Sequence, residues 1–552
     1  MYFLTMYIDS AVTKRGDKTY TRHLLRESYR EDGRIKHRTL LNLSSRSLTE
    51  INALKLALKH KDRLASLLAV NGVESALGKR IGAVFALKTI VEKTGIAKAL
   101  GNGPDAKLAI LQIIARVIDQ GSRLSAVRLA ESHALCEILG IGKLDEDDLY
   151  PNLVWLAEHQ EQIEKKLFAG RFSNATPTLF LYDVTSAYLE GAKNAFAAFG
   201  YNRDGKKGKL QIVVGMLTGP NGLPVAVRVF EGNTNDTKTV SEQVRILAEN
   251  FGVKEVTLVG DRGMLKGPQI ATLPDDFRYV TAITKPQIVK LLAEGTFQME
   301  LFSEQVCEVT VEDVRYVLRR NPVRAQQIAE SRKSKHSAIA KFAADQTQYL
   351  ALHPKAYANK ALARVTKKRD QLKANWLTVT ETERKLSVVS DDAALANAAL
   401  LDGCYVIKSD VPKANANAQS LHDRYCDLEN VERAFRTMKT AHLDLRPVYV
   451  HRASSTRGHV FVVMLALIVQ RELEKCWSEL DLTPEEGIDE LGAISTLELR
   501  LGDETMMNTI PKPSPRAAAL LSRASVILPS ALPLPHANVH TKKKLSAERN
   551  QT

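Results

Sequence analysis

The feature that most constrains the fold is a change of hydrophobic period near Pro177, where β-branched apolar runs replace helical spacing. The runs expected to form strands are 178–185, 210–218, 223–230, 256–259 and 277–283. A turn from Gly219 to Gly222 separates the second and third runs, so we expect these to pair as neighbouring strands. A helix capped at Asn235 is predicted before the fourth run. This order predicts a mixed α/β sheet.

Two aspartates lie at the ends of apolar runs: Asp183 in LFLYDVTSAY and Asp261 in VTLVGDRGM. An ionised carboxylate at the end of a hydrophobic strand is costly unless it is paired or binds a cation. Either aspartate alone is more often a cap or a turn former. Because Mg²⁺ binds through one or two protein carboxylates plus phosphate oxygens, the pair on adjacent predicted strands indicates a divalent-metal site for phosphodiester chemistry.

A third acidic side chain comes from a helix predicted over 423–440, DRYCDLENVERAFRTMKT. Its apolar face repeats at three and four residues. Beside that face runs a polar stripe, formed by Tyr425, Glu429, Glu432, Arg436 and Lys439. Glu432 therefore lies among cations, as a site that holds both metal and a phosphate backbone requires. The alternative is a solvent face with a Glu432–Arg436 ion pair, worth about a few tenths of a kcal/mol.

Charge is concentrated in one segment of this basic chain, whose formal net charge is +14. Residues 315–373 hold fifteen Lys or Arg against three acidic residues. Such a stretch neutralises phosphates well, although solvated surface helices have similar composition. It lies between Asp261 and Glu432, which are 171 positions apart, far more than a simple connection needs, so an insertion is expected there.

Length and composition limit the class of protein. A chain of 552 residues predicts several domains. The five cysteines are scattered without a C-x-x-C pair, which argues against a zinc knuckle or a disulfide framework and fits a reducing cytoplasm. The apolar segment 460–469 is too short for a membrane span of about 20 residues and is expected to be a buried helix. The first residues lack the features of a secretory signal.

The chain resembles a branch of bacterial insertion-sequence transposases of the Asp-Asp-Glu (DDE) type. Their signature is Tyr, two residues, Arg, three residues, Glu, six residues, Lys, and Tyr425, Glu432 and Lys439 match it. Leu428 stands at the arginine position, which leaves that DNA contact to Arg424 or Arg436. The segments LYDVTSAYLEG, EGNTNDTKTV, VGDRGM and VERAFRTMKTAHLDLRPVYVH are also similar to this family.

This resemblance implies an α/β ribonuclease H-like catalytic domain interrupted by an insertion, preceded by a small β unit and an all-helical domain. The expected division is 1–45 as a β-hairpin unit built around Asp32-Gly33, 46–176 as a helical DNA-binding or dimerisation region, 177–290 with 400–475 as the catalytic domain, 291–399 as the basic insertion, and 476–552 as a C-terminal helical region with a loosely ordered, basic, Pro-rich tail.

The resemblance also implies a mechanism. Asp183, Asp261 and Glu432 would hold two Mg²⁺, with Mn²⁺ able to substitute, for cleavage at element ends and strand transfer into target DNA. The expected DNA contacts are Tyr425, Arg436, Lys439 and Arg446.

The expected partners are double-stranded DNA with terminal inverted repeats and a target, bound by a homodimer. The expected location is the cytoplasm, on the nucleoid when bound, with no membrane. Two alternatives stay open: a structure-selective nuclease on the same fold, and an inactive DNA-binding repressor.

Overall fold

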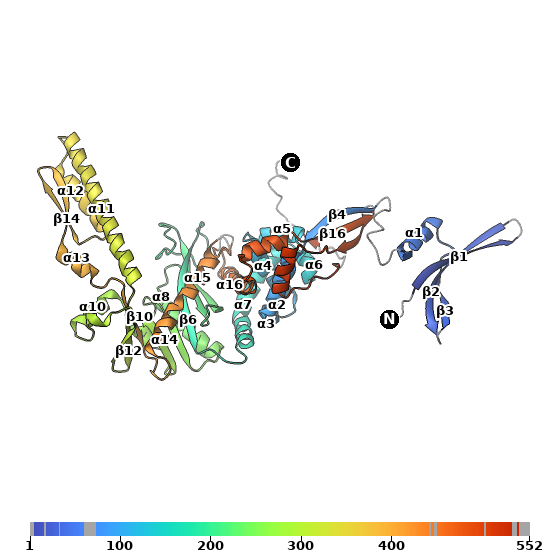
Figure 1. Cartoon of the computed structure of the whole chain (residues 1–552), viewed down its shortest axis with the longest axis horizontal. Helices are drawn as coiled ribbons and strands as arrows, with labels where there is room; N and C mark the ends of the chain where they lie inside the picture. Colours follow the sequence, from blue (N-terminus) through green and yellow to red (C-terminus); the bar gives the residue numbers. More distant parts are fainter. Residues whose placement is uncertain are drawn as a thin grey trace.

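The structure is a computed structural model that describes residues 5–15, 18–31, 34–59, 73–440, 443–446, 450–501, 504–532 and 538–539. Figure 1 shows a small N-terminal sheet at one end, a helical body and a large sheet in the middle, and an arm built around α11 at the other end.

The N-terminal unit is a three-stranded antiparallel sheet followed by one helix. Its elements are β1 (Thr5–Arg15), β2 (Lys18–Glu31), β3 (Arg34–Asn42) and α1 (Leu48–Lys59). The Asp32-Gly33 turn lies outside the described residues, but Glu31 pairs with Arg34, so the expected hairpin pairing is confirmed. The Ser47 hydroxyl and the Glu50 carboxylate satisfy each other's backbone N–H groups and start α1.

The helical body is built from segments far apart in sequence. Its members are α2 (Gly82–Lys93), α3 (Ile96–Leu100), α4 (Pro104–Ile118), α5 (Arg123–Ser132), α6 (Leu135–Leu139), α7 (Glu146–Arg171), α16 (Ala453–Trp477), α17 (Pro484–Gly492) and α18 (Pro515–Arg523). Between Gly458 and Gln470 helix α16 is buried on all sides, so its neighbours enclose this part of it. It is long and apolar enough to cross a bilayer, yet 83% of its most apolar window is buried inside the protein, which confirms the expected buried helix.

Two features of this body differ from the expected helical regions. A three-stranded sheet joins β4 (Val73–Arg80) to β16 (Ser495–Leu501) and β17 (Glu504–Thr509), because β4 pairs with a strand more than 400 residues later. The tail expected to be loosely ordered contains α18, which buries Ala517, Leu520 and Leu521. In addition, β18 (Asn538–Val539) pairs with β5 (Lys143–Leu144).

The main sheet has eight strands in the order β11-β12-β15-β10-β9-β6-β7-β8. Their bounds are β6 (Leu179–Tyr188), β7 (Gln211–Thr218), β8 (Pro224–Glu231), β9 (Val256–Gly260), β10 (Phe277–Ala282), β11 (Cys307–Val311), β12 (Val314–Arg320) and β15 (Cys404–Ser409). Neighbours β6, β9 and β10 are parallel, and every other pairing is antiparallel. The expected mixed sheet is thus confirmed.

Alternate residues of the central strands face two different layers, as the pleat requires. Tyr182 and Val213 pack with the layer that contains α8 (Asp236–Arg245) and its π-helical continuation η2 (Ile246–Asn250). Leu181 and Val214 belong to the core that includes residues of α16 and of α15 (Leu428–Lys439). Asp183 follows Leu181 by two residues, so its side chain lies on the α15 side of the sheet.

Smaller helices complete the sheet's surroundings. They are α9 (Gly267–Ile270), α10 (Lys285–Ala293), the 3₁₀ helix η3 (Met299–Leu301) and α14 (Ala418–Cys426).

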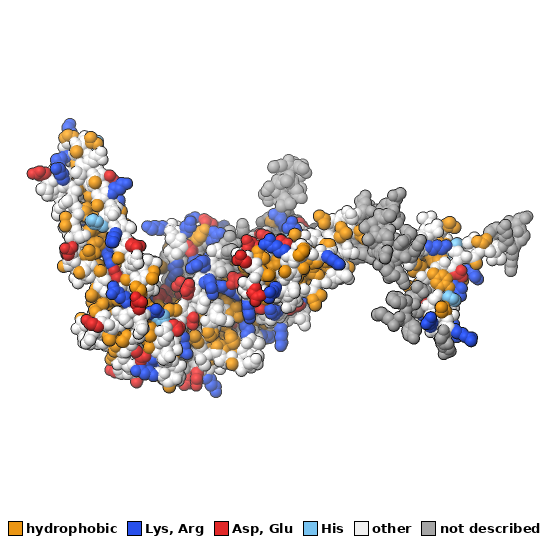
Figure 2. All heavy atoms as spheres, in the orientation of Figure 1, with side chains coloured by type: hydrophobic (Ala, Val, Ile, Leu, Met, Phe, Trp, Pro, Cys, Tyr) orange, Lys and Arg blue, Asp and Glu red, His pale blue; other side chains and the backbone are white. Residues whose placement is uncertain are grey.

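The arm contains α11 (Pro322–Leu352), α12 (Ala358–Gln371), β13 (Leu377–Thr382), β14 (Lys385–Ser390) and α13 (Asp392–Ala399). It has a core of its own, in which Ile339, Val365 and Leu377 are buried. Figure 2 shows Lys and Arg side chains spread along its visible face. The expected insertion over 291–399 needs one correction: β11 and β12 fall in that range but extend the main sheet, so the separate unit begins at α11.

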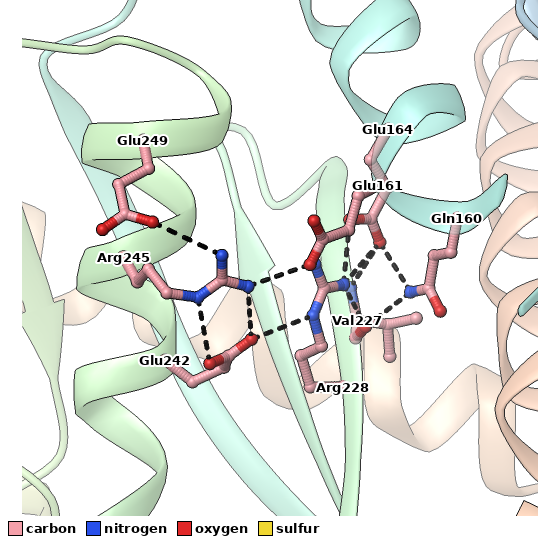
Figure 3. Close-up of polar contacts among 8 residues, drawn as sticks. All are labelled: Gln160, Glu161, Glu164, Val227, Arg228, Glu242, Arg245 and Glu249. Carbon is pink, nitrogen blue, oxygen red and sulfur yellow. Dashed lines mark hydrogen bonds and ion pairs between the residues drawn. The ribbon is translucent and has the colours of Figure 1, made fainter. Parts of the chain in front are cut away.

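A network of charged side chains joins the helical body to the main sheet (Figure 3). Glu164 of α7 accepts hydrogen bonds from Arg228 Nη1 of β8 at 2.9 and 2.8 Å and from Gln160 Nε2 at 2.8 Å. The backbone N–H of Val227 also donates to Glu164. Arg245 of α8 pairs with Glu161 and Glu242 at the outer side of the network. One buried carboxylate thus ties α7 to a strand of the sheet.

Candidate active site

The two aspartates lie side by side at the centre of the main sheet. Strands β6 and β9 are parallel neighbours, and their register pairs Tyr182 with Gly260. The next position along each strand is Asp183 and Asp261, so the register places the two carboxylates opposite each other. Both residues continue the alternation that faces α15, since Leu181 and Val259 belong to the core on that side. The expectation of two aspartates on adjacent strands is confirmed.

The third carboxylate reaches the same place on α15. The helix predicted over 423–440 is divided, because α14 ends at Cys426 and α15 begins at Leu428. Asp427 between them keeps a helical backbone, with φ −59° and ψ −16°. Lys439, near the end of α15, donates a hydrogen bond of 2.9 Å to Thr185 Oγ1 on β6. This contact helps to hold the helix over the strand that carries Asp183.

These elements enclose a cavity of about 1450 Å³. Six of the seven residues predicted for the site line it: Asp183, Asp261, Glu432, Tyr425, Arg436 and Lys439. Arg446 does not line it. Its guanidinium donates to Asp444 Oδ1 at 2.9 Å and to the Tyr188 hydroxyl at 2.6 Å. Arg446 therefore pins the chain after α15 to the end of β6.

The three carboxylates share the cavity without converging on one point. Within the part of the chain that the structure describes, no three Asp, Glu, His or Cys side chains are close enough to hold one metal ion. That Asp183, Asp261 and Glu432 hold metal together stays a prediction. Glu432 is exposed and makes no hydrogen bond or ion pair to a described side chain, so nothing fixes its rotamer.

The electrostatics of the cavity favour a cation near Asp183. Burial raises the pKa of this carboxyl to about 7, and the negative charges of Asp261 and Glu432 add to the shift. The Tyr425 hydroxyl donates to Asp261 Oδ1 over a long 3.4 Å. Burial and the Asp261 charge raise the pKa of Tyr425, so the phenol stays protonated and can donate. Carboxylates gathered around a buried carboxyl group suit a divalent cation.

Several cavity residues were not identified from the sequence. Arg203 forms a two-oxygen salt bridge with Asp236, at 2.7 and 2.6 Å, on one wall. Arg324 enters from the first turn of α11. Asp204, close to the cavity, pairs with Lys439. Asp236 lies in the EGNTNDTKTV segment, which is one of those that carry the resemblance. No feature of the sequence indicated that α11 would reach the cavity.

Residues 174–469, more than half of the chain, match a family model described as the transposase DDE domain. The chain belongs to the DDE transposase family. Residues 9–69 of this transposase match a second model, described as the N-terminal domain of IS1634 family transposases. The transposase matches none of the curated proteins searched. It is accordingly an insertion-sequence transposase, an enzyme that binds DNA, cleaves it and transfers strands with the help of divalent metal.

Proposed function

We propose that Asp183, Asp261 and Glu432 are the metal ligands and catalytic residues of this transposase, and that the metal is Mg²⁺. The observation that carries the proposal is their common cavity, in which burial and the two other carboxylates raise the pKa of Asp183 to about 7. A site that destabilises its own ionised carboxylates is relieved when a divalent cation binds.

Closure of the trio requires only side-chain movement in this proposal. Glu432 is exposed and free to change rotamer. Asp261 is also exposed, and its Oδ1 accepts hydrogen bonds from the Arg262 N–H at 2.7 Å and from the Tyr425 hydroxyl at 3.4 Å. We infer that metal and DNA phosphate together draw Glu432 toward the two aspartates. Two Mg²⁺, when bound, would stabilise the attacking and leaving oxygens of an in-line displacement at phosphorus.

The remaining cavity residues would position DNA. Tyr425 orients Asp261 through its hydroxyl, and Lys439 keeps α15 on β6 while its charge faces the cavity. Arg436 is exposed, lines the cavity and has no ion pair with a described residue, so it can bind a phosphate. Arg446 would act indirectly, through the Asp444 and Tyr188 contacts that hold the neighbouring chain.

The strand order supports assigning the sheet to the ribonuclease H-like class. Five neighbouring strands of the sheet lie in the spatial order β10-β9-β6-β7-β8. Along the chain, the antiparallel strands β6, β7 and β8 come first, and β9 and β10, which run parallel to β6, come next. The ribonuclease H-like class has this chain order. The arm lies between β12 and β15, upstream of Glu432, as an insertion would. We further propose the Tyr-Arg-Glu-Lys branch, with Arg324 of α11 as an additional candidate for the contact that Leu428 cannot make.

The proposed substrates are the terminal inverted repeats of the element and a target duplex, bound by a homodimer on the nucleoid. The basic arm and the helical region, expected to serve in DNA binding or dimerisation, would contact the DNA outside the cavity. A structure-selective nuclease or a binding-only repressor would differ in products rather than in DNA affinity.

One experiment separates these functions. The transposase is incubated with Mg²⁺, labelled duplexes from the flanks of its gene and a target plasmid, and the products are resolved on gels. Cleaved ends joined to plasmid support the proposal, whereas cut ends without joining indicate a nuclease. Asp183→Asn should abolish both products and leave DNA binding intact. If Asp183→Asn cleaves and joins as the unaltered protein does, the assignment of the catalytic residues is wrong.

A further inference from the structure

A second cavity, of about 880 Å³, lies where the helical body meets the main sheet. Its walls come from the ends of α2 and α7, from α3 and α16, and from the connection between β7 and β8. Figure 1 shows α2, α3 and α7 next to one another in the helical body. No described residue lines both this cavity and the carboxylate cavity, so the two spaces are separate. Its volume is in the range of small-molecule sites.

Positive charge dominates the lining of this second cavity. Its described lining residues include four cations and one carboxylate, namely Lys93, Lys98, Lys166, Arg171 and Glu472. Glu472 pairs with Lys93 at 2.9 Å. Lys98 and Lys166 are exposed, and neither forms an ion pair with a described residue. Exposed lysines are common on any protein surface, so the buried arginine decides whether this lining is a binding site.

Arg171 supplies a buried donor that no described residue uses. It is the last residue of α7, and its Nη1 donates to the Pro224 carbonyl at 2.8 Å. Its Nη2 is buried and makes no hydrogen bond to a described residue. Burial lowers the pKa of Arg171 to about 10, so the guanidinium still carries its charge at neutral pH. A water molecule would satisfy the free N–H group, but only an anion would also compensate the charge.

The combination of one arginine and two lysines favours a multivalent anion. A carboxylate carries a single negative charge, whereas a phosphate monoester carries about two at neutral pH. Arginine donates to phosphate oxygens in a fixed geometry, and lysine adds compact positive charge. The cavity also has room for a tetrahedral group, because small residues line part of it: Gly95, Ala99, Ala169 and Gly170. A Cβ added at Gly95 or Gly170 would meet no atom within 4 Å.

We propose that this second cavity binds a phosphate group, with Arg171 Nη2 donating to a phosphate oxygen and Lys98 and Lys166 compensating its charge. The phosphate comes either from a free phosphorylated molecule or from the backbone of bound DNA, and both present the same oxygens to the three cations. The proposal does not depend on the assignment of the catalytic residues, because the two cavities are separate.

Calorimetric titration of the full-length transposase with pyrophosphate tests the assignment. EDTA is present, so that no divalent metal bridges the probe to the carboxylates. The unaltered protein should bind pyrophosphate saturably, and Lys98→Gln and Lys166→Gln should each weaken the affinity by about three- to tenfold. Arg171→Met should abolish measurable binding, with thermal unfolding used to show that this variant folds. Because both lysines are exposed, their variants keep the test valid even if Arg171→Met does not fold.

The neighbouring lysine provides a matched control. Lys165 precedes Lys166 on α7 and is also exposed, but it does not line the cavity, so Lys165→Gln should bind pyrophosphate as the unaltered protein does. Arg436→Gln tests the carboxylate cavity as the place where pyrophosphate binds, and it should leave this affinity unchanged. The proposal is overturned if pyrophosphate does not bind, if Lys166→Gln binds it as tightly as Lys165→Gln, or if only Arg436→Gln loses it.

A second titration identifies the source of the phosphate. Fluorescence anisotropy with duplex DNA, at several salt concentrations, compares the double variant Lys98→Gln with Lys166→Gln against Lys165→Gln. If the cavity holds a backbone phosphate, the salt slope of the double variant should be smaller by about one to two, and pyrophosphate should displace DNA. If DNA affinity is unchanged while pyrophosphate binding is lost, the ligand is a free phosphorylated molecule. Both results support a phosphate site at Arg171.

Discussion

Replacement of Arg228 by Met should destabilise the transposase by about 3–5 kcal/mol, because it leaves a buried carboxylate without its partner. The Glu164 side chain is 1% exposed and that of Arg228 is 13% exposed, so water cannot solvate the charge that remains (Figure 3). Gln160 and the Val227 N–H would still donate to Glu164, but neither is charged. The methionine keeps most of the aliphatic volume, which restricts the loss to electrostatics and hydrogen bonding.

The pH dependence of this loss has a definite sign. Burial raises the pKa of Glu164 above its ordinary value even beside Arg228. The folded protein then holds this proton more tightly than the unfolded chain, so ionisation of Glu164 lowers stability as the pH rises through the folded pKa. Without Arg228 that pKa rises further. The loss of folding stability caused by Arg228→Met should therefore be largest at about pH 8 and smaller at about pH 5.

Urea unfolding followed by tryptophan fluorescence measures the loss, since Trp155 lies on α7, the helix that carries Glu164. Arg245→Met is the matched control: this arginine is 37% exposed in the same network, and its removal should cost about 0–1 kcal/mol. The double variant Glu164→Gln with Arg228→Met should recover most of the stability. If Arg228→Met unfolds like Arg245→Met at every pH, the network does not hold α7 to the sheet.

Three further outcomes follow from the site and the core. Because Asp183 must be ionised to bind metal and its pKa is raised to about 7, Mn²⁺ affinity measured by titration calorimetry should fall as the pH drops below about 7. Arg436→Gln should weaken DNA binding for all sequences and reduce the salt slope by about one, as measured by fluorescence anisotropy. Gly458→Ala should destabilise the core by about 1–3 kcal/mol in thermal unfolding, because its Cβ would stand 2.0 Å from the Leu153 carbonyl oxygen.

Each of these outcomes has its own control. Arg433 lies on the same helix as Arg436, but it donates a hydrogen bond to Asn430 and does not line the cavity. The salt dependence of DNA binding should therefore be unchanged in Arg433→Gln. A Cβ added at Gly492 would have no atom within 4 Å. Gly492→Ala should therefore leave thermal stability unchanged or raise it slightly. A pH-independent Mn²⁺ affinity would show that Asp183 is not a ligand.

Local pattern determined much of this protein. Apolar runs specified the bounds of the central strands to within three residues, and their alternation assigned Asp183 to a defined face once its strand was known. Spacing of three and four residues placed Glu432, Arg436 and Lys439 on one stripe of α15. These features follow from chain geometry within a single strand or helix, so the sequence alone carries them.

Tertiary contacts decided the rest. Strand β4 pairs with β16 across more than 400 residues. Arg324 reaches the cavity from an arm whose composition indicated phosphate binding or solvated surface helices, but not a place at this cavity. The break at Asp427 and the separation of Glu432 from the aspartates also depend on how α14 and α15 pack on the sheet. Such pairings are fixed by burial and charge between distant segments, which no periodicity within either segment encodes.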